Sequence, residues 1–123
     1  MDFQEYQNLA SKTAIYMKKF EEQQYEEMPS LVYKFLGLSY CANGLGEVGE
    51  IQGKVKKIFR DQGGEITEEN KKDLAKELGD VLWYVSAMCG ELVLSMDDVA
   101  QGNIDKLFSR KERGQLEGSG DDR

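Results

Sequence analysis

Two pairs of acidic residues share one spacing in this chain. Glu47 and Glu50 are three residues apart in the stretch GLGEVGEIQGK, and Glu77 and Asp80 are three apart in KELGDVLWY. Residues three apart lie on the same side of an α-helix. Carboxylate oxygens are the ligands that Mg²⁺ and Mn²⁺ prefer in proteins. If the two pairs come together, they predict a site for a divalent cation.

Both acidic pairs lie beside the apolar face of a segment with helical periodicity. On a wheel at about 100° per residue, Glu47 and Glu50 lie about 70° and 130° from the centre of their apolar face. Glu77 and Asp80 lie about 60° and 120° from theirs, in the same rotational sense. Each pair is roughly 22 Å from the turn between the segments. If the helices pack antiparallel, we expect the four carboxylates to meet at one level, at the margin of the core.

Polar and basic residues flank the first acidic pair. Asn43 and Lys54 fall on the same stripe of the helix as the glutamates, and Lys57 is close by. Cations beside a metal site favour a phosphorylated ligand. The alternative is that the acidic pairs are solvated helix edges and that the lysines only screen the glutamates.

Three glycines interrupt the same stretch. Gly46, Gly49 and Gly53 each cost the helix roughly 1 kcal/mol relative to alanine. We expect them either to clear space around the carboxylates for a ligand or to permit close helix packing.

The amino-acid composition excludes several classes of function. The chain has 123 residues, which suits one domain, and a net charge of −7, which argues against nucleic-acid binding. It has no histidine, so histidine bases and most zinc sites are excluded. The two cysteines, Cys41 and Cys89, fall on apolar helix faces, which indicates buried free thiols in a reducing compartment. With no signal peptide and no long apolar stretch, we expect a cytoplasmic protein without a membrane span.

The elements that must position these residues are helices. With one proline and no strand alternation, the chain predicts an all-α bundle of about four helices. Residues 1–113 would form this helical domain, and the glycine-rich acidic residues 114–123 a tail without regular structure. The four predicted helices cover residues 3–26, residues 31–60, a segment that begins after Thr67 and carries apolar residues to Leu92, and residues 96–113.

At the acidic pairs the chain resembles the MazG-like, all-α nucleoside triphosphate pyrophosphohydrolases. The family's EExxE motif corresponds to GEVGE at residues 46–50, and its ExxD motif to ELGD at residues 77–80. The first glutamate of the family pattern is Gly46 here, which leaves the four carboxylates in place. The resemblance runs from about residue 36 to the carboxyl terminus.

The resemblance implies a Mg²⁺-dependent enzyme, with Mn²⁺ as a possible substitute. It would cleave nucleoside triphosphates between the α and β phosphates, giving the monophosphate and pyrophosphate, and would clear aberrant nucleotides. Glu47, Glu50, Glu77 and Asp80 would hold the metal. Glu50 would also activate water, and Lys54 would offset charge on the phosphates.

The resemblance also implies roles for the last helix and for assembly. The family's NxxKL…R pattern matches Asn103, Lys106 and Arg110, which would contact the nucleotide or else form a solvated polar face. Wide apolar helix faces predict a homodimer or homotetramer, with nucleotide pockets near the subunit interface. Two alternatives are a phosphoribosyl-ATP pyrophosphohydrolase-like enzyme and a non-catalytic helical interaction module.

Overall fold

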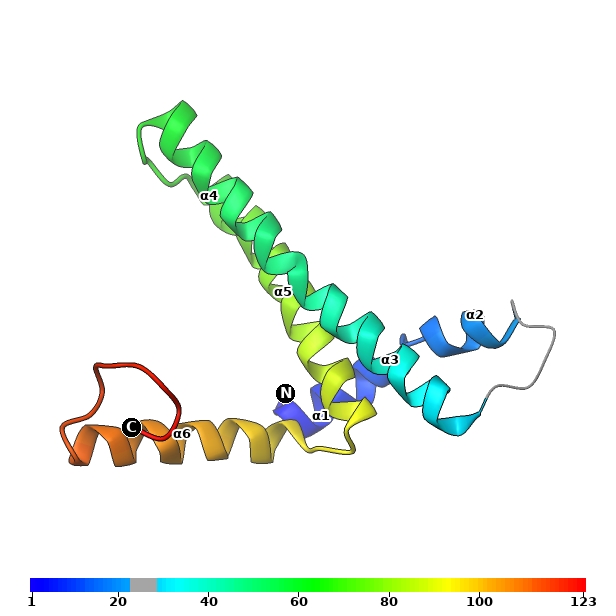
Figure 1. Cartoon of the computed structure of the whole chain (residues 1–123). Coiled ribbons are helices and arrows are strands. Elements are labelled where there is room, and N and C mark those ends of the chain that lie inside the picture. Colours follow the sequence, from blue (N-terminus) through cyan, green and yellow to red (C-terminus); the bar gives the residue numbers. More distant parts are fainter. Residues whose placement is uncertain (23–28) are drawn as a thin grey trace.

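The structure is a computed structural model that describes residues 1–22 and 29–123 (Figure 1). These residues form helices and no strand, which confirms the all-α class. The elements are α1 (Phe3–Ser11), α2 (Tyr16–Glu22), α3 (Ser30–Gly44), the short 3₁₀-helix η1 (Leu45–Glu47), α4 (Val48–Gln62), α5 (Glu68–Glu91) and α6 (Met96–Glu112).

The first predicted helix is two helices in the part of the chain that the structure describes. At the end of α1 the Thr13 hydroxyl donates to the carbonyl of Ala10 at 2.8 Å. The same hydroxyl accepts from Trp83 Nε1 of α5, also at 2.8 Å. A side chain that bonds the local backbone competes with helix continuation, and the contact with α5 holds that arrangement. The predicted stretch beyond Glu22, to residue 26, lies outside the described residues.

The second predicted helix is an almost continuous rod of α3, η1 and α4, and this rod lies along α5 (Figure 1). Gly63, in the left-handed conformation at φ 61°, ends α4 as the sequence predicts. Thr67 and Asn70 form a capping box that starts α5. The short connection makes the two arms antiparallel, which is the arrangement that the acidic pairs require.

The remaining helices lie at the end of this hairpin that is opposite the turn between α4 and α5 (Figure 1). Gln7 of α1 donates to the carbonyl of Leu94 at 2.9 Å and accepts from the backbone N–H of Met96 at 3.0 Å. These contacts hold the turn between α5 and α6, where the chain bends by 105°. No single helix among residues 1–22 and 29–123 is long and apolar enough to cross a membrane; α5 and α6 meet that criterion only as a pair, across the bend.

The core is small and partly aromatic. Tyr16 stacks on Tyr40 with ring centroids 4.5 Å apart, and Trp83 meets Tyr84 edge-on at 5.1 Å. Both cysteines are buried and free, as the sequence predicts. The buried hydrophobic side chains are Tyr16, Cys41, Ile58, Cys89 and Met96.

Candidate active site

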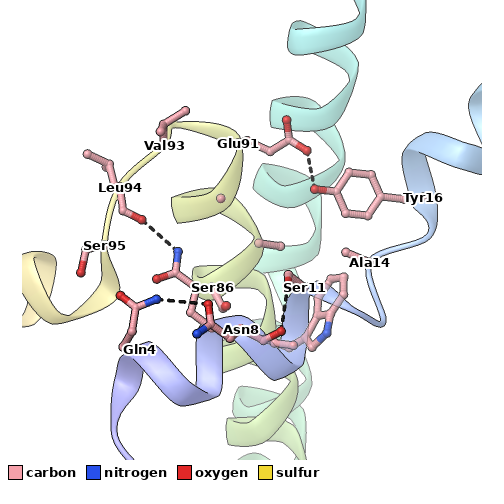
Figure 2. A pocket seen from close by; sticks show the side chains of 15 residues that line it. Gln4, Asn8, Ser11, Ala14, Tyr16, Ser86, Glu91, Val93, Leu94 and Ser95 are labelled. Atoms are coloured by element: carbon pink, nitrogen blue, oxygen red, sulfur yellow. Dashed lines mark hydrogen bonds between the residues drawn. The ribbon is translucent and has the colours of Figure 1, made fainter.

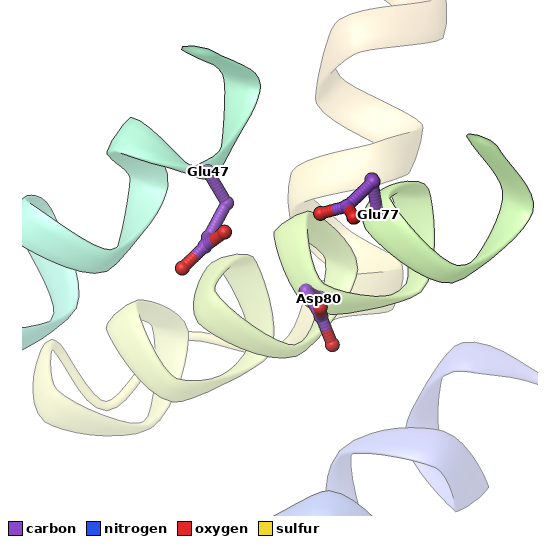
Figure 3. A group of neighbouring side chains, drawn as sticks. All are labelled: Glu47, Glu77 and Asp80. Atoms are coloured by element: carbon purple, nitrogen blue, oxygen red, sulfur yellow. The ribbon is translucent and has the colours of Figure 1, made fainter. Parts of the chain in front are cut away.

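Three of the four predicted metal ligands come together between the two arms of the hairpin (Figure 3). Glu47 of η1 and Glu77 and Asp80 of α5 each offer a carboxylate oxygen, and the three oxygens lie within 4.8 Å of one another. Glu47 and Glu77 are half-buried and Asp80 is exposed. The antiparallel packing of rod and α5 therefore brings the acidic motifs to one level, as the helical wheels predict.

Glu50 lies outside this acidic group, with an exposed side chain on the first turn of α4. It is farther around the helix from the packed face than Glu47. In addition, the 3₁₀ turn at Leu45–Glu47 advances about 120° per residue instead of 100°, which changes the rotation of Glu47 relative to α4. The sequence could not reveal this tightened turn.

Lys54 is paired with one of the three carboxylates. Its Nζ lies 2.7 Å from Glu77 Oε1. The hydrogen bond to Glu77 is the largest cause that raises the pKa of Lys54 above its ordinary value, with smaller contributions from the charges of Glu77, Asp73 and Glu50. Lys54 thus neutralises one carboxylate across the helix pair. Three carboxylates and one ammonium leave a net charge of −2, which matches a divalent cation.

An open cleft of about 440 Å³ adjoins the acidic group. Glu47 and Asp80 form part of its wall. Burial raises the pKa of the Tyr84 phenol, and a hydrogen bond with Tyr40 and the charges of Glu47 and Asp80 raise it further. Tyr84 therefore stays protonated and can donate a hydrogen bond. The other lining residues are Thr13, Tyr40, Trp83 and Tyr84.

The aromatic residues Trp83 and Tyr84 of α5 line this cleft. A signal was present in the sequence, because they follow Asp80 by three and four residues and so lie on its side of the helix. Gly44 makes room for Tyr84, since a Cβ at that position would collide with the tyrosine ring.

The three glycines that interrupt the acidic stretch face open space. A Cβ added at Gly46, Gly49 or Gly53 would meet no atom within 4 Å outside its own helix. Close helix packing within the chain therefore does not explain them. Their positions remain consistent with space kept free beside the carboxylates.

The other predicted contact residues of the hairpin lie apart from the acidic group. Asn43 is exposed near the end of α3, one turn before Glu47. Lys57 is exposed on α4 and lines a separate cavity nearer the hairpin turn, with Lys54 at its edge.

The predicted contact residues of α6 are farther away. Asn103 and Lys106 line a cavity in the angle between α5 and α6, together with Leu82. Leu82 lies about 200° around α5 from Asp80, so this cavity is on the opposite side of α5. Arg110 is one turn further along α6. Within one chain, the structure does not bring these three residues to the acidic group.

The acidic group fits a magnesium ion. At an Mg–O distance of about 2.1 Å, two ligand oxygens lie about 3 to 4.2 Å apart. The three carboxylate oxygens, already within 4.8 Å of one another, need only a small closure to reach that spacing. An all-oxygen donor set with a net charge of −2 suits Mg²⁺ or Mn²⁺ better than zinc, which favours nitrogen and sulfur ligands.

Comparison with known proteins agrees with this geometry. The MazG nucleotide pyrophosphohydrolase domain matches residues 37–114, which is well over half of the chain and contains all the candidate site residues. The "Gene 37 protein" of Mycobacterium phage L5 is 49% identical over 119 residues, which cover 96% of each chain. No solved structure matches. The chain belongs to the family of MazG nucleotide pyrophosphohydrolase domains.

Proposed function

We propose that this protein is a Mg²⁺-dependent nucleoside triphosphate pyrophosphohydrolase that releases pyrophosphate and a nucleoside monophosphate. The observation that carries the proposal is the convergence of Glu47, Glu77 and Asp80 within 4.8 Å, beside an aromatic cleft, in a chain of this family. Clearance of aberrant nucleotides would be its role in the cell.

Glu47, Glu77 and Asp80 would hold the metal ion, with Glu50 completing the ligand set through a rotamer change on the first turn of α4. When bound, Mg²⁺ neutralises phosphate charge and polarises the phosphorus under attack. One carboxylate would orient or deprotonate the attacking water, and we assign this role to Glu50 because its side chain is exposed next to the group. Lys54 would leave Glu77 and contact a phosphate.

The nucleoside would extend from the acidic cleft toward the larger cavity beside α1 (Figure 2). That cavity has a volume of about 570 Å³ and shares Trp83 with the cleft. Gln4 and Asn8 line it with side-chain amides, each of which offers both a donor and an acceptor. An indole between the metal group and an amide-lined cavity supports a base that stacks on Trp83 and is read by hydrogen bonds.

The direct test is release of pyrophosphate from a panel of canonical and damaged nucleotides, with Mg²⁺, with Mn²⁺ and with a chelator. We expect activity only with metal. In ¹⁸O-labelled water the label should enter the monophosphate, because water would attack the α-phosphorus. Primary release of orthophosphate, or full activity with the chelator, would contradict the proposal.

Single substitutions in the acidic group should separate catalysis from folding. Glu47→Gln and Asp80→Asn each remove a charge and keep the side-chain shape, so we expect loss of at least about 100-fold in turnover with unchanged helix content. Both variants should be as stable as the parent or more stable without metal, since repulsion falls. Glu65→Gln, in the exposed loop between α4 and α5, is the matched control and should keep full activity.

A further inference from the structure

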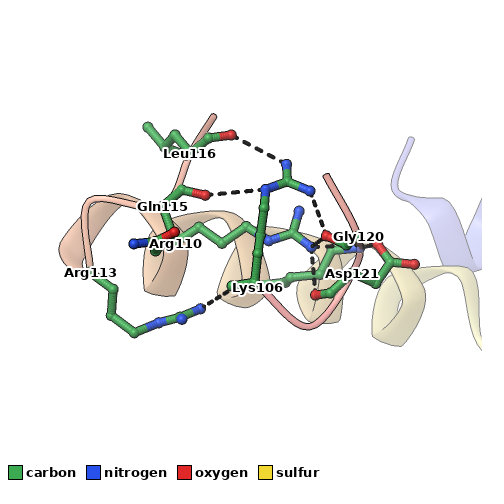
Figure 4. A network of polar contacts seen from close by, with 8 residues as sticks. Lys106, Arg110, Arg113, Gln115, Leu116, Gly120 and Asp121 are labelled. Atoms are coloured by element: carbon green, nitrogen blue, oxygen red, sulfur yellow. Dashed lines mark hydrogen bonds and ion pairs between the residues drawn. The ribbon is translucent and has the colours of Figure 1, made fainter. Parts of the chain in front are cut away.

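The carboxyl-terminal residues fold back over the last turns of α6 (Figure 4). We call residues 115–123 the C-terminal strap. Positive φ angles at Gly114 (68°), Gly118 (118°) and Gly120 (88°) turn its backbone. Glycine adopts such angles without steric cost, so the glycine pattern of the sequence permits this path. The strap contains no helix or strand, and its return over α6 is a tertiary contact.

Arg110 lies beneath the strap. It is 5% exposed and is the one charged side chain that is buried in the described part of the chain. Its Nη2 donates to the carbonyl oxygens of Gly120 at 3.3 Å and Asp121 at 2.6 Å. Its Nε is buried without a hydrogen-bond partner. Because a guanidinium carries five N–H donors, the strap satisfies this cation only in part.

Asp121 brings a carboxylate to the same place. Its Oδ1 lies 3.5 Å from both Lys106 Nζ and Arg110 Nη2. Charge-assisted contacts of this kind are normally about 2.7–2.9 Å, so the carboxylate fits the two cations loosely. A phosphate group carries more charge and more acceptor oxygens than a carboxylate. It would bind the same pair of cations at shorter distances.

The strap itself is weakly held. Asp121 is 87% exposed at its side chain, and Leu116, the strap's large apolar residue, is 50% exposed. The Arg123 side chain donates to backbone oxygens of Gln115, Leu116 and Gly120, which closes the strap on itself. The carbonyl oxygen of Arg123 accepts from Arg113 Nη2 at the end of α6 at 2.9 Å. The Lys106–Asp121 pair is exposed on both sides and contributes little to stability. A stronger anion therefore competes mainly with the contacts of the strap to Arg110.

We propose that Lys106 and Arg110 form a binding site for a phosphate-type oxyanion and that the strap occupies this site through Asp121 until such an anion displaces it. The strap is then a built-in competitor of the ligand. That the ligand is a nucleotide phosphate rests on the proposed function, whereas the anion site does not. The strap lies beyond residue 114, where the match to the family domain ends.

The test is calorimetric binding of pyrophosphate to the full-length, chelator-treated protein, in which the acidic group cannot recruit the probe through metal. Asp121→Asn removes the competing charge, and Gly118→Ala strains the strap at its φ of 118° without a change in charge. We expect both variants to bind pyrophosphate about twofold to fivefold more tightly than the parent, because each variant weakens only part of the hold of the strap on α6. Asp122→Asn is the control: it makes the same charge change at the neighbouring exposed residue and should leave affinity nearly unchanged.

Arg110→Gln should abolish pyrophosphate binding while circular dichroism shows full helix content. Retained binding in this variant, or no binding to any form of the protein, would overturn the anion site. Equal effects of Asp121→Asn and Asp122→Asn, or weaker binding in Gly118→Ala, would overturn the competing role of the strap. Failure to hydrolyse nucleotides would instead count against the proposed function and leave these results standing.

Discussion

Lys54 and Glu77 form the single contact that most constrains the candidate site. Their ion pair of 2.7 Å places an ammonium group on a carboxylate that the metal ion would need. The pair therefore acts as a competitor of the metal, and also keeps a cation ready for the phosphates of the substrate. The raised pKa of Lys54 means that its charge, and the stability that the pair contributes, are fully present below its ordinary pKa of 10.5. That contribution is lost only as the pH rises through the higher folded value.

Substitution of Lys54 should separate these two effects. In Lys54→Gln we expect Mg²⁺ to bind about threefold to tenfold more tightly, because a competing charge is gone. Turnover should fall about tenfold or more, because a cation near the phosphates is lost. A metal titration measures the Mg²⁺ affinity, and the release of pyrophosphate measures turnover. Lys57→Gln changes an exposed lysine on the same helix and serves as the control; neither its Mg²⁺ affinity nor its turnover should change by more than about twofold. Weaker Mg²⁺ binding in Lys54→Gln would refute the competition between Lys54 and the metal.

Asp121 makes the strap sensitive to acid. Lys106 and then Arg110 lower the pKa of its carboxyl below the ordinary value of 3.8. The contribution of these contacts is present above pH 3.8 and is lost as the pH falls through the lower folded value. We expect the two carboxylate contacts of Asp121 to persist at neutral pH and to be lost only in more acidic solution, while the backbone carbonyls of the strap still accept from Arg110. NMR of the Arg110 guanidinium signals during a titration would show this, and an unchanged spectrum down to full protonation of Asp121 would contradict it.

Among the elements, the junction between α3 and α4 carries most of the site. Here glycine serves two opposite purposes. A Cβ at Gly44 would collide with the ring of Tyr84, whereas a Cβ at Gly49 would meet no atom within 4 Å. Gly44 is therefore needed for packing, and Gly49 lies about 200° around the helix from Glu47, away from the acidic group.

Alanine substitution should distinguish these purposes. Gly44→Ala forces the Tyr84 ring to move, and we expect a loss of about 1–3 kcal/mol in the free energy of unfolding. Gly49→Ala should instead stabilise α4 by up to about 1 kcal/mol and leave turnover unchanged, because the methyl group points away from Glu47 into open space. Thermal unfolding and pyrophosphate release test both. Gly102→Ala on α6 controls for helix propensity alone, and a loss of turnover in Gly49→Ala would show that a ligand uses the open space at this position.

The turn between α5 and α6 stores local strain. Val93 has a φ of 56° and is 87% exposed, at the position after the helix cap where glycine is usual. A left-handed conformation costs a non-glycine residue roughly 1–2 kcal/mol. Since no packing would be lost, we expect Val93→Gly to raise the free energy of unfolding by about 1 kcal/mol, measured by denaturant titration. If the variant is instead less stable, the Val93 side chain must make a packing contact in the functional protein.

As a single chain the molecule is elongated, and many of its large apolar side chains are exposed to solvent (Figure 1). Large apolar residues are exposed on α3, α5 and α6, among them Phe35 at 60%, Leu78 at 57% and Phe108 at 56%. Leu78 lies about 200° around α5 from Asp80, on the opposite side of the helix. These surfaces favour self-association, and a second copy would also supply the cations that one chain keeps away from its own acidic group.

We therefore predict a homodimer or homotetramer with shared sites. Sedimentation at micromolar concentration should give a multiple of the 14.0 kDa chain mass. Glu77→Gln and Arg110→Gln should each be inactive alone, and mixing them should restore part of the activity, because one intact site forms when the defects lie on different subunits. A monomer with full activity, or no recovery after subunit exchange, would refute shared sites.

The sequence by itself determined the helical class, the antiparallel hairpin and the meeting of the two acidic motifs. Glycine and capping residues fix where α4 ends and α5 begins, and a period of 3.6 fixes which side of each helix a carboxylate occupies. Such features are local, or follow from one short connection, so they can be read from residue spacing.

Only the tertiary structure decided the contacts between distant segments. The break after α1 depends on Thr13 meeting Trp83, seventy residues later in the chain. The pairing of Lys54 with Glu77 and the return of Asp121 onto Arg110 likewise depend on how segments pack. A helical wheel gives the direction of a side chain on one element, whereas its partner depends on the crossing of two elements, which no local pattern encodes.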